Sequence, residues 1–154
     1  MKFRELLLVL RRHKVEHLVV GGVAAVLRGA PVSTFDLDIV HKRSAGNIGR
    51  LMEALEELDA RYRDLTGRTL RPTAEALLGK GHHLLRTTMG PLDILGSVLE
   101  TDDYDSLLPR CEPVSLSEGS VPVLTIEALI DIKRRLGRPK DRLAVEILEE
   151  FRRL

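Results

Sequence analysis

Apolar residues recur along the chain with two different periods, and these periods predict a mixture of helices and strands. Spacings of three and four predict helices over residues 3–13, 23–28, 48–60 and 126–136, and a last helix that runs to residue 154. Short apolar runs and alternating patterns predict strands over residues 17–20, 35–40, 82–88, 92–95 and 121–124. The mixture predicts the α/β (α+β) class.

Turn and cap residues punctuate this pattern. Gly21 and Gly22 end the first strand and begin a helix, Gly90 and Pro91 predict a hairpin turn, and Thr125 is a predicted N-cap. Residues 61–81 predict an irregular region with one short helix over residues 74–78, and the acidic segment 100–118 predicts a solvated flank. Because the sequence has no repeat and no linker, we expect a single domain over residues 1–154.

Composition narrows the functional classes. The chain has 24 Lys and Arg against 23 Asp and Glu, a net charge of +1, so it lacks the strongly basic body of a general nucleic-acid binder. Three Phe, two Tyr and no Trp are too few for a base-stacking platform. The single Cys111 excludes an internal disulfide, which suits the cytoplasm, and the thiol has no activating base nearby in the sequence. The apolar run at residues 6–10 is too short for a membrane span or a signal peptide.

Two aspartates form the clearest candidate for chemistry. Asp36 and Asp38 lie two residues apart on a predicted strand, so their carboxylates project from one face about 7 Å apart. Such a pair repels unless it is solvated or binds a divalent cation, and oxygen ligands favour Mg²⁺. Without further context, the two aspartates are best interpreted as part of the solvated face of an edge strand. Asp93, an acid inside the apolar run GPLDIL, is a third carboxylate that could approach them.

Phosphate-binding candidates lie on both sides of these acids. Gly21 and Gly22 begin a helix whose free backbone N–H groups could receive a phosphate, although a plain turn is an equal alternative. Lys133, Arg138 and Lys140 lie in the one dense basic segment, residues 131–142, where a solvated helix surface is the alternative.

The histidines are less promising. His82 and His83 are adjacent and should point to opposite faces of a strand, so we expect structural roles for both. His41 is expected in an exposed loop.

These residues together resemble a known family. The run VVGGVAA (residues 19–25), thirteen residues between Gly22 and Asp36, and then TFDLDIV (34–40) are similar to the signature of the nucleotidyltransferase superfamily that includes DNA polymerase beta. The likeness is greatest to small bacterial minimal nucleotidyltransferases and AbiEii-like toxin nucleotidyltransferases. TTMGPLD (87–93), LIDIK (129–133) and GRPKD (137–141) extend it over about residues 18–141.

The resemblance implies a fold and a site. The expected fold is a short mixed sheet with helices packed on one side and a C-terminal helical segment. Asp36 and Asp38 match the family's Mg²⁺ ligands, and Asp93 matches the acid that completes a second metal position and can take the proton of an acceptor. The implied nucleotide-binding positions are Gly21, Gly22, Thr34 and Lys133. Gly22 stands where the commonest form of the family has Ser, and no basic residue directly precedes Thr34.

The implied function is Mg²⁺-dependent transfer of a nucleoside monophosphate from an NTP to a hydroxyl acceptor in the cytoplasm. RNA or tRNA, a protein or a small molecule all remain open as the acceptor, and so does a toxin–antitoxin role. A homodimer or a partner protein could complete the cleft. The alternative is a catalytically silent protein of the same fold that acts as a binding or antitoxin-like partner, and a metal-dependent phosphohydrolase ranks third.

Overall fold

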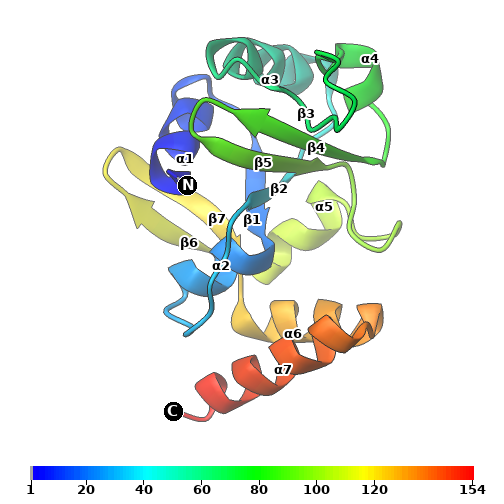
Figure 1. Ribbon diagram of the computed structural model, residues 1–154. Helices are drawn as coiled ribbons and strands as arrows, with labels where there is room; N and C mark the ends of the chain where they lie inside the picture. The colour runs from blue at the N-terminus through cyan, green and yellow to red at the C-terminus, as the bar shows by residue number, and fades with distance from the viewer. Residues whose placement is uncertain (1) are drawn as a thin grey trace.

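The computed structural model describes residues 2–154, and within them a mixed sheet of seven short strands forms the centre (Figure 1). The strands are β1 (His17–Val20), β2 (Leu37–His41), β3 (Arg61–Tyr62), β4 (His82–Thr87), β5 (Gly90–Leu95), β6 (Cys111–Leu116) and β7 (Gly119–Leu124). Their order across the sheet is β3-β4-β5-β2-β1-β7-β6. β2 runs parallel to β5 and β1 parallel to β7, and the other neighbours are antiparallel.

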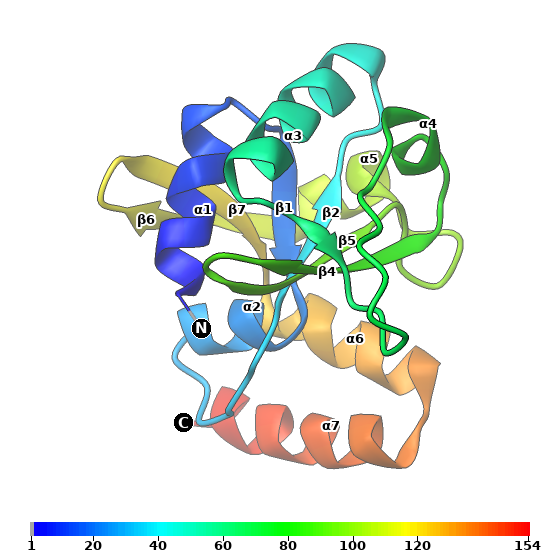
Figure 2. The ribbon, with the colours of Figure 1, turned by 45° about the horizontal axis from the view of Figure 1, so that its top comes forward.

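The helices gather in two places. They are α1 (Phe3–Arg12), α2 (Gly21–Leu27), α3 (Ala45–Glu57), α4 (Ala74–Leu77), α5 (Tyr104–Leu107), α6 (Ile126–Leu136) and α7 (Pro139–Arg152), with a 3₁₀ turn at Leu108–Arg110. α1 and α3 cover one face of the sheet, whereas α2, α6 and α7 lie together at the end where β1 gives way to α2 (Figures 1 and 2). The α/β class and the C-terminal helical segment are therefore confirmed.

Apolar burial explains this arrangement. All four residues of β1 are buried, as are Leu37, Ile39 and Val40 of β2, and both strands lie in the middle of the sheet order. α1 buries Leu6, Leu7, Val9 and Leu10, and α3 buries Ile48, Leu51, Ala54 and Leu55. The helical stripes in the sequence are thus the faces that pack on the sheet.

Most predicted elements form within a few residues of their expected ends. The Thr125 hydroxyl accepts a hydrogen bond from the Ala128 N–H at 3.2 Å and caps α6 as predicted. The hairpin turn lies two residues earlier in the chain than predicted. Thr88 and Met89 make the turn, with the Met89 N–H bonded to the Thr87 hydroxyl at 3.0 Å, whereas Gly90 and Pro91 already belong to β5.

Two regions without strong apolar patterns nevertheless join the sheet. Arg61–Tyr62 adds β3 at one edge, and Cys111–Leu116 forms β6 at the other, so the prediction of an acidic flank over residues 100–118 is wrong for its second half. β6 pairs with β7 over its whole length although half of its residues are exposed and none is fully buried. Edge strands are held largely by backbone hydrogen bonds, which hydrophobic periodicity does not report.

Buried histidines mark the face beneath α1 and α3. His41 ends β2 with no exposed surface, and its Nε2 lies 2.8 Å from the Leu77 carbonyl, so the prediction of an exposed loop is wrong. Burial lowers the pKa of His41, and it lowers the pKa of His17 to about 4. His83 is buried and contacts the Tyr62 hydroxyl at 2.7 Å, while His82 points to the exposed face, as alternation along β4 predicts.

None of the helices described here has the length and apolar character needed to cross a membrane.

Candidate active site

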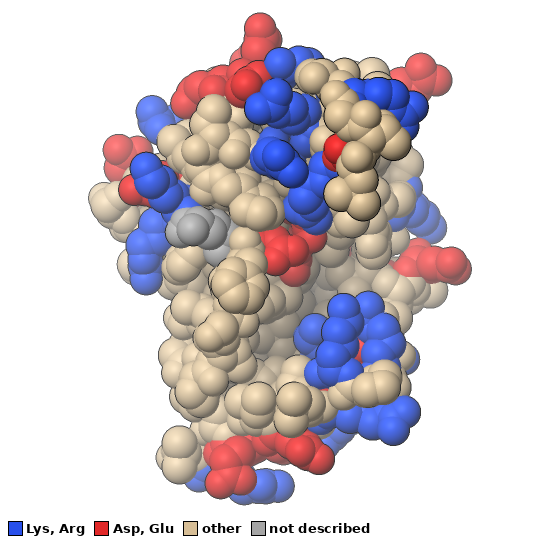
Figure 3. Space-filling model, in the orientation of Figure 1, with Lys and Arg blue, Asp and Glu red and all other residues tan. Residues whose placement is uncertain are grey.

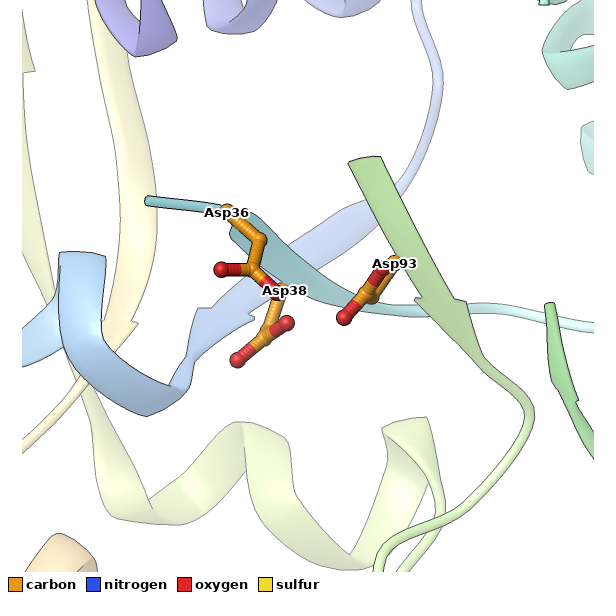
Figure 4. A group of neighbouring side chains, drawn as sticks. All are labelled: Asp36, Asp38 and Asp93. Atoms are coloured by element: carbon orange, nitrogen blue, oxygen red, sulfur yellow. The ribbon is translucent and has the colours of Figure 1, made fainter. Parts of the chain in front are cut away.

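The structure brings the three predicted acids together. Asp36 directly precedes β2, Asp38 is the second residue of β2, and Asp93 lies on the parallel neighbour β5 (Figure 4). Asp38 and Asp93 are direct register partners, so their side chains leave the same face of the sheet. One carboxylate oxygen from each of the three acids lies within 4.8 Å of the others. That spacing suits a shared cation.

The strand begins two residues later than the alternation predicts. β2 starts at Leu37, and Phe35, predicted on an apolar face, is 78% exposed. Asp36 therefore reaches the cluster from the turn that leads into the strand. Phe35 lies outside the core because the sheet ends before it.

Negative charge in this cluster is incompletely balanced. Burial, together with the carboxylates of Asp93 and Asp36, raises the pKa of Asp38 to about 8, and Lys133 offsets only part of the effect. Burial and Asp93 also raise the pKa of Asp36, against the opposing influence of Arg63 and Lys140. Asp36 and Asp38 therefore hold a proton more tightly than ordinary carboxyls, because they are removed from water beside another carboxylate.

Gly21 makes room for the cluster. It has a φ of +67°, and a Cβ atom there would fall within the Asp38 carboxylate. Only glycine combines that backbone with that approach. The glycine at this strand-to-helix turn therefore allows the Asp38 carboxylate to lie against the Gly21 backbone.

Gly22 and Thr34 form a second close contact. A Cβ on Gly22 would lie 2.6 Å from the Thr34 Oγ1, and that hydroxyl donates to the Asp36 carbonyl at 3.2 Å. Thr34 thus fixes the turn that presents Asp36. A serine at position 22 would require Thr34 to move, which accounts for the glycine found there.

The acids line a cavity of about 440 Å³. Its opposite wall carries Lys133, Arg138 and Lys140, and its floor is apolar. Figure 3 shows this hollow with acidic atoms above it and a group of basic atoms below. A second cavity of about 360 Å³ shares Gly21, Lys133 and Lys140 with the first, and also has Gly22 in its lining. Thr34 is absent from both linings.

A buried aspartate holds the basic wall in place. Asp141, with no exposed surface, accepts hydrogen bonds from the Arg138 backbone N–H and guanidinium and lies 3.4 Å from the Lys133 Nζ. The Arg138 bonds, followed by the positive charges of Lys133 and Arg138, lower the pKa of Asp141. Asp141 was not among the predicted site residues, although an acid three residues after an N-cap is a capping pattern.

Arg63 and His82 are site residues that sequence reasoning also missed. The Arg63 Nη2 lies 2.7 Å from the Asp93 Oδ1 and its Nη1 donates to the Leu85 carbonyl. Arg63 belongs to an arginine-rich segment with no apolar period, so no pattern distinguished it. His82 lines the acid cavity, with its Nε2 3.0 Å from the Ser97 carbonyl.

No protein-family model matches the sequence, and no curated protein matches it either. Solved structures do match. A lincosamide antibiotic adenylyltransferase, LnuA, in complex with lincomycin has a TM-score of 0.60 at 14% identity over 96% of this chain and 94% of that chain. ANT(2")-Ia, in complex with adenylyl-2"-tobramycin, has a TM-score of 0.58 at 15% identity over 95% and 84%.

A third match is TM1012 of Thermotoga maritima, described as a candidate nucleotidyltransferase. It has a TM-score of 0.58 at 18% identity, over 94% of this chain and 88% of that chain. The chain has the nucleotidyltransferase fold. At these identities the likeness concerns the fold, so the chemistry of the site has to be argued from its own residues.

The close approach at Gly21 generates a stability prediction. We expect Gly21→Ala to lower the free energy of unfolding by about 1–3 kcal/mol, because it combines a strained backbone with displacement of Asp38. Gly49→Ala in α3, where a Cβ meets nothing within 4 Å, is the matched control and should stabilise by up to about 1 kcal/mol. Urea unfolding measures both. Equal effects of the two substitutions would contradict the close approach.

The raised pKa of Asp38 generates a second prediction. A carboxyl whose folded pKa is raised stabilises the protein below its unfolded pKa, and that contribution is lost as pH rises toward about 8. Without divalent cations at pH 8, Asp38→Asn should therefore raise the unfolding free energy by about 1 kcal/mol or more. The gain should shrink at pH 5, and Mg²⁺ should stabilise the variant less than the wild type. Denaturant titrations in EDTA and in Mg²⁺ test this, and a variant less stable than wild type at pH 8 in EDTA would refute it.

Proposed function

We propose that the protein is a metal-dependent nucleotidyltransferase, which moves a nucleoside monophosphate from an NTP to a hydroxyl group of an acceptor. The observation that carries this proposal is the acid cluster. Asp36, Asp38 and Asp93 converge from adjoining strands on one cavity, opposite a basic wall. Carboxylates facing cations across a cavity suit a substrate that brings phosphates and a divalent ion together.

The cluster fits Mg²⁺ by the chemistry of its donors. Three carboxylates offer hard oxygen atoms within 4.8 Å of one another, and burial beside the carboxylates of Asp93 and Asp36 raises the pKa of Asp38. Bound there, Mg²⁺ would neutralise charge on the phosphates and on the leaving pyrophosphate. The proposed ligands are Asp36, Asp38 and Asp93.

The chain's own residues supply binding and proton transfer. Lys133 and Lys140 line both cavities and can bind phosphate oxygens between them, with Arg138 beside them on the wall of the acid cavity. Gly21, with no side chain, keeps the passage beside Asp38 open. Asp93 is 8% exposed and is the most buried of the three acids. We propose that its carboxylate takes the proton from the hydroxyl group of the acceptor.

The second cavity is the proposed place of the nucleoside. Beyond the two lysines its lining is mainly apolar, with Leu129 and Ala144 on facing helices and Ser33 as one of few polar groups. Its lining includes no aromatic side chain, so a base would be held by aliphatic packing. Such a pocket discriminates weakly among bases because it offers few hydrogen-bond partners.

A hydroxyl-bearing small molecule is the proposed acceptor class. The acid cavity of about 440 Å³ falls in the ordinary range for small-molecule pockets. Two of the similar structures hold lincomycin and an adenylylated tobramycin, which are small molecules. Transfer to RNA or protein, the toxin–antitoxin role, the cytoplasmic location and a partner or dimer stay predictions from the sequence.

The direct test is transfer of label from each α-labelled NTP, with Mg²⁺, into the small-molecule, RNA and protein fractions of a cell lysate. We expect label in the small-molecule fraction, and a loss of about 100-fold or more in Asp36→Asn and Asp38→Asn. Asp105→Asn, at an exposed acid of α5, is the matched control and should retain transfer. Folded wild-type protein that transfers no label from any NTP would contradict the proposal and favour a silent binding protein.

The proposed nucleoside cavity has its own test. Ala144→Trp should fill it and weaken NTP binding about tenfold or more, while leaving the affinity for Mg²⁺-tripolyphosphate unchanged, since the phosphates lie outside it. Glu146→Trp, on the exposed face of α7, is the control. Calorimetric titration of each ligand measures the effect. Equal losses for both ligands, or no loss for either, would place the nucleoside elsewhere.

A further inference from the structure

One cation is built directly into the acid cluster, and it comes from a segment with no sequence pattern. Arg63 follows β3, and its backbone N–H donates to the Leu84 carbonyl at 3.1 Å. Its guanidinium then extends across the edge of β4. The Nη1 donates to the Leu85 carbonyl at 3.0 Å, and the Nη2 donates to the Asp93 Oδ1 at 2.7 Å.

These three bonds hold Arg63 in place, two through its guanidinium and one through its backbone N–H. Two of them end on backbone carbonyls of a paired strand, which cannot rearrange without breaking the sheet. The Arg63 side chain is 29% exposed and that of Asp93 12%, so the pair is partly shielded from solvent. A shielded, doubly anchored guanidinium is a more permanent charge than a lysine on a free stem.

The cations of the opposite wall are placed differently. Lys133 is engaged by the buried Asp141, and Lys140 is exposed. Across the described residues 2–154, Arg63 is the partner of the one ion pair within 4.0 Å that this acid cluster makes. Lys133 and Lys140 line the cavity without pairing with its acids, whereas Arg63 is bonded directly to Asp93.

We propose that Arg63 is a positioning residue of the site, which holds Asp93 through its Oδ1 and supplies a fixed positive charge that limits the affinity of the acid cluster for divalent cations. When all three carboxyls are ionised they carry a charge of −3, and Arg63 reduces it to −2, which one divalent cation neutralises. Arg63 engages Oδ1 of Asp93, so the other oxygen of that carboxylate has no bond to the guanidinium. The inference rests on the proposed function only in taking the three acids as cation ligands.

Measuring the affinity for divalent cations in the absence of nucleotide distinguishes this electrostatic role of Arg63 from a merely structural one. We expect the wild type to bind one Mn²⁺ at pH 8.5, as counted by electron paramagnetic resonance and calorimetry. Arg63→Gln should bind the first Mn²⁺ about tenfold more tightly or admit a second ion, because a nearby positive charge has been removed. Structural damage at the cluster would act in the opposite direction and weaken binding.

Three further variants complete the test. Arg63→Lys keeps the charge and should bind Mn²⁺ as the wild type does. Arg63→Met keeps a long apolar stem and should match Arg63→Gln, so the result does not depend on one replacement folding. Arg61→Gln removes the same charge from an exposed neighbour on β3 and should change the Mn²⁺ affinity less than twofold.

The outcomes separate this inference from the proposed function. Tighter Mn²⁺ binding in Arg63→Gln and Arg63→Met alone supports the role of Arg63, even if no NTP is ever used. Unchanged or weaker binding in these variants, or a wild type that binds no Mn²⁺, overturns it, even if label transfer is found. An equal effect of Arg61→Gln also overturns it, because the effect would then reflect overall charge.

Discussion

The repulsion among three carboxylates is the constraint around which this end of the molecule is built. Asp38 and Asp93 face the same way because β2 and β5 are parallel and in register, and Asp36 joins them from the preceding turn. Such a cluster is costly unless cations approach it. The Arg63 guanidinium offsets part of that cost, and the absent side chain at Gly21 leaves the space that Asp38 occupies.

Positive charge reaches the acids in two ways. The Arg63 guanidinium is bonded to β4 and to Asp93, so its positive charge is present at the site without any ligand. Lys133 and Lys140 lie across the cavity on the helical segment, where a phosphate-bearing ligand could join the two sides. The buried Asp141 ties the start of α7 to α6 and thereby holds Lys133 and Arg138 of the basic wall next to each other. The geometry at the cavity thus depends on a residue that does not line it.

The strongest sequence patterns were also the most reliable. The stripes of α1, α3 and α6 and the buried run of β1 are dictated by burial, which periodicity reports directly. β3 and β6 could not be found in this way, because edge strands need only a partner's backbone. His41 was misplaced for a related reason. A polar residue at the end of a strand is exposed unless another segment covers it, and here Leu77 of α4 lies against its ring.

The sequence by itself determined the class of fold, the strand-to-helix turn at the glycine pair and the identity of the three acids. It did so because alternation, helical period and a polar residue within an apolar run are local features. Only the tertiary structure decided that β5 lies beside β2, that Arg63 pairs with Asp93, and that His82 enters the cavity. Those facts depend on which strands become neighbours and on the position of the segment after β3, which has no hydrophobic period. Neighbours are chosen by the packing of the whole core, which no local pattern records.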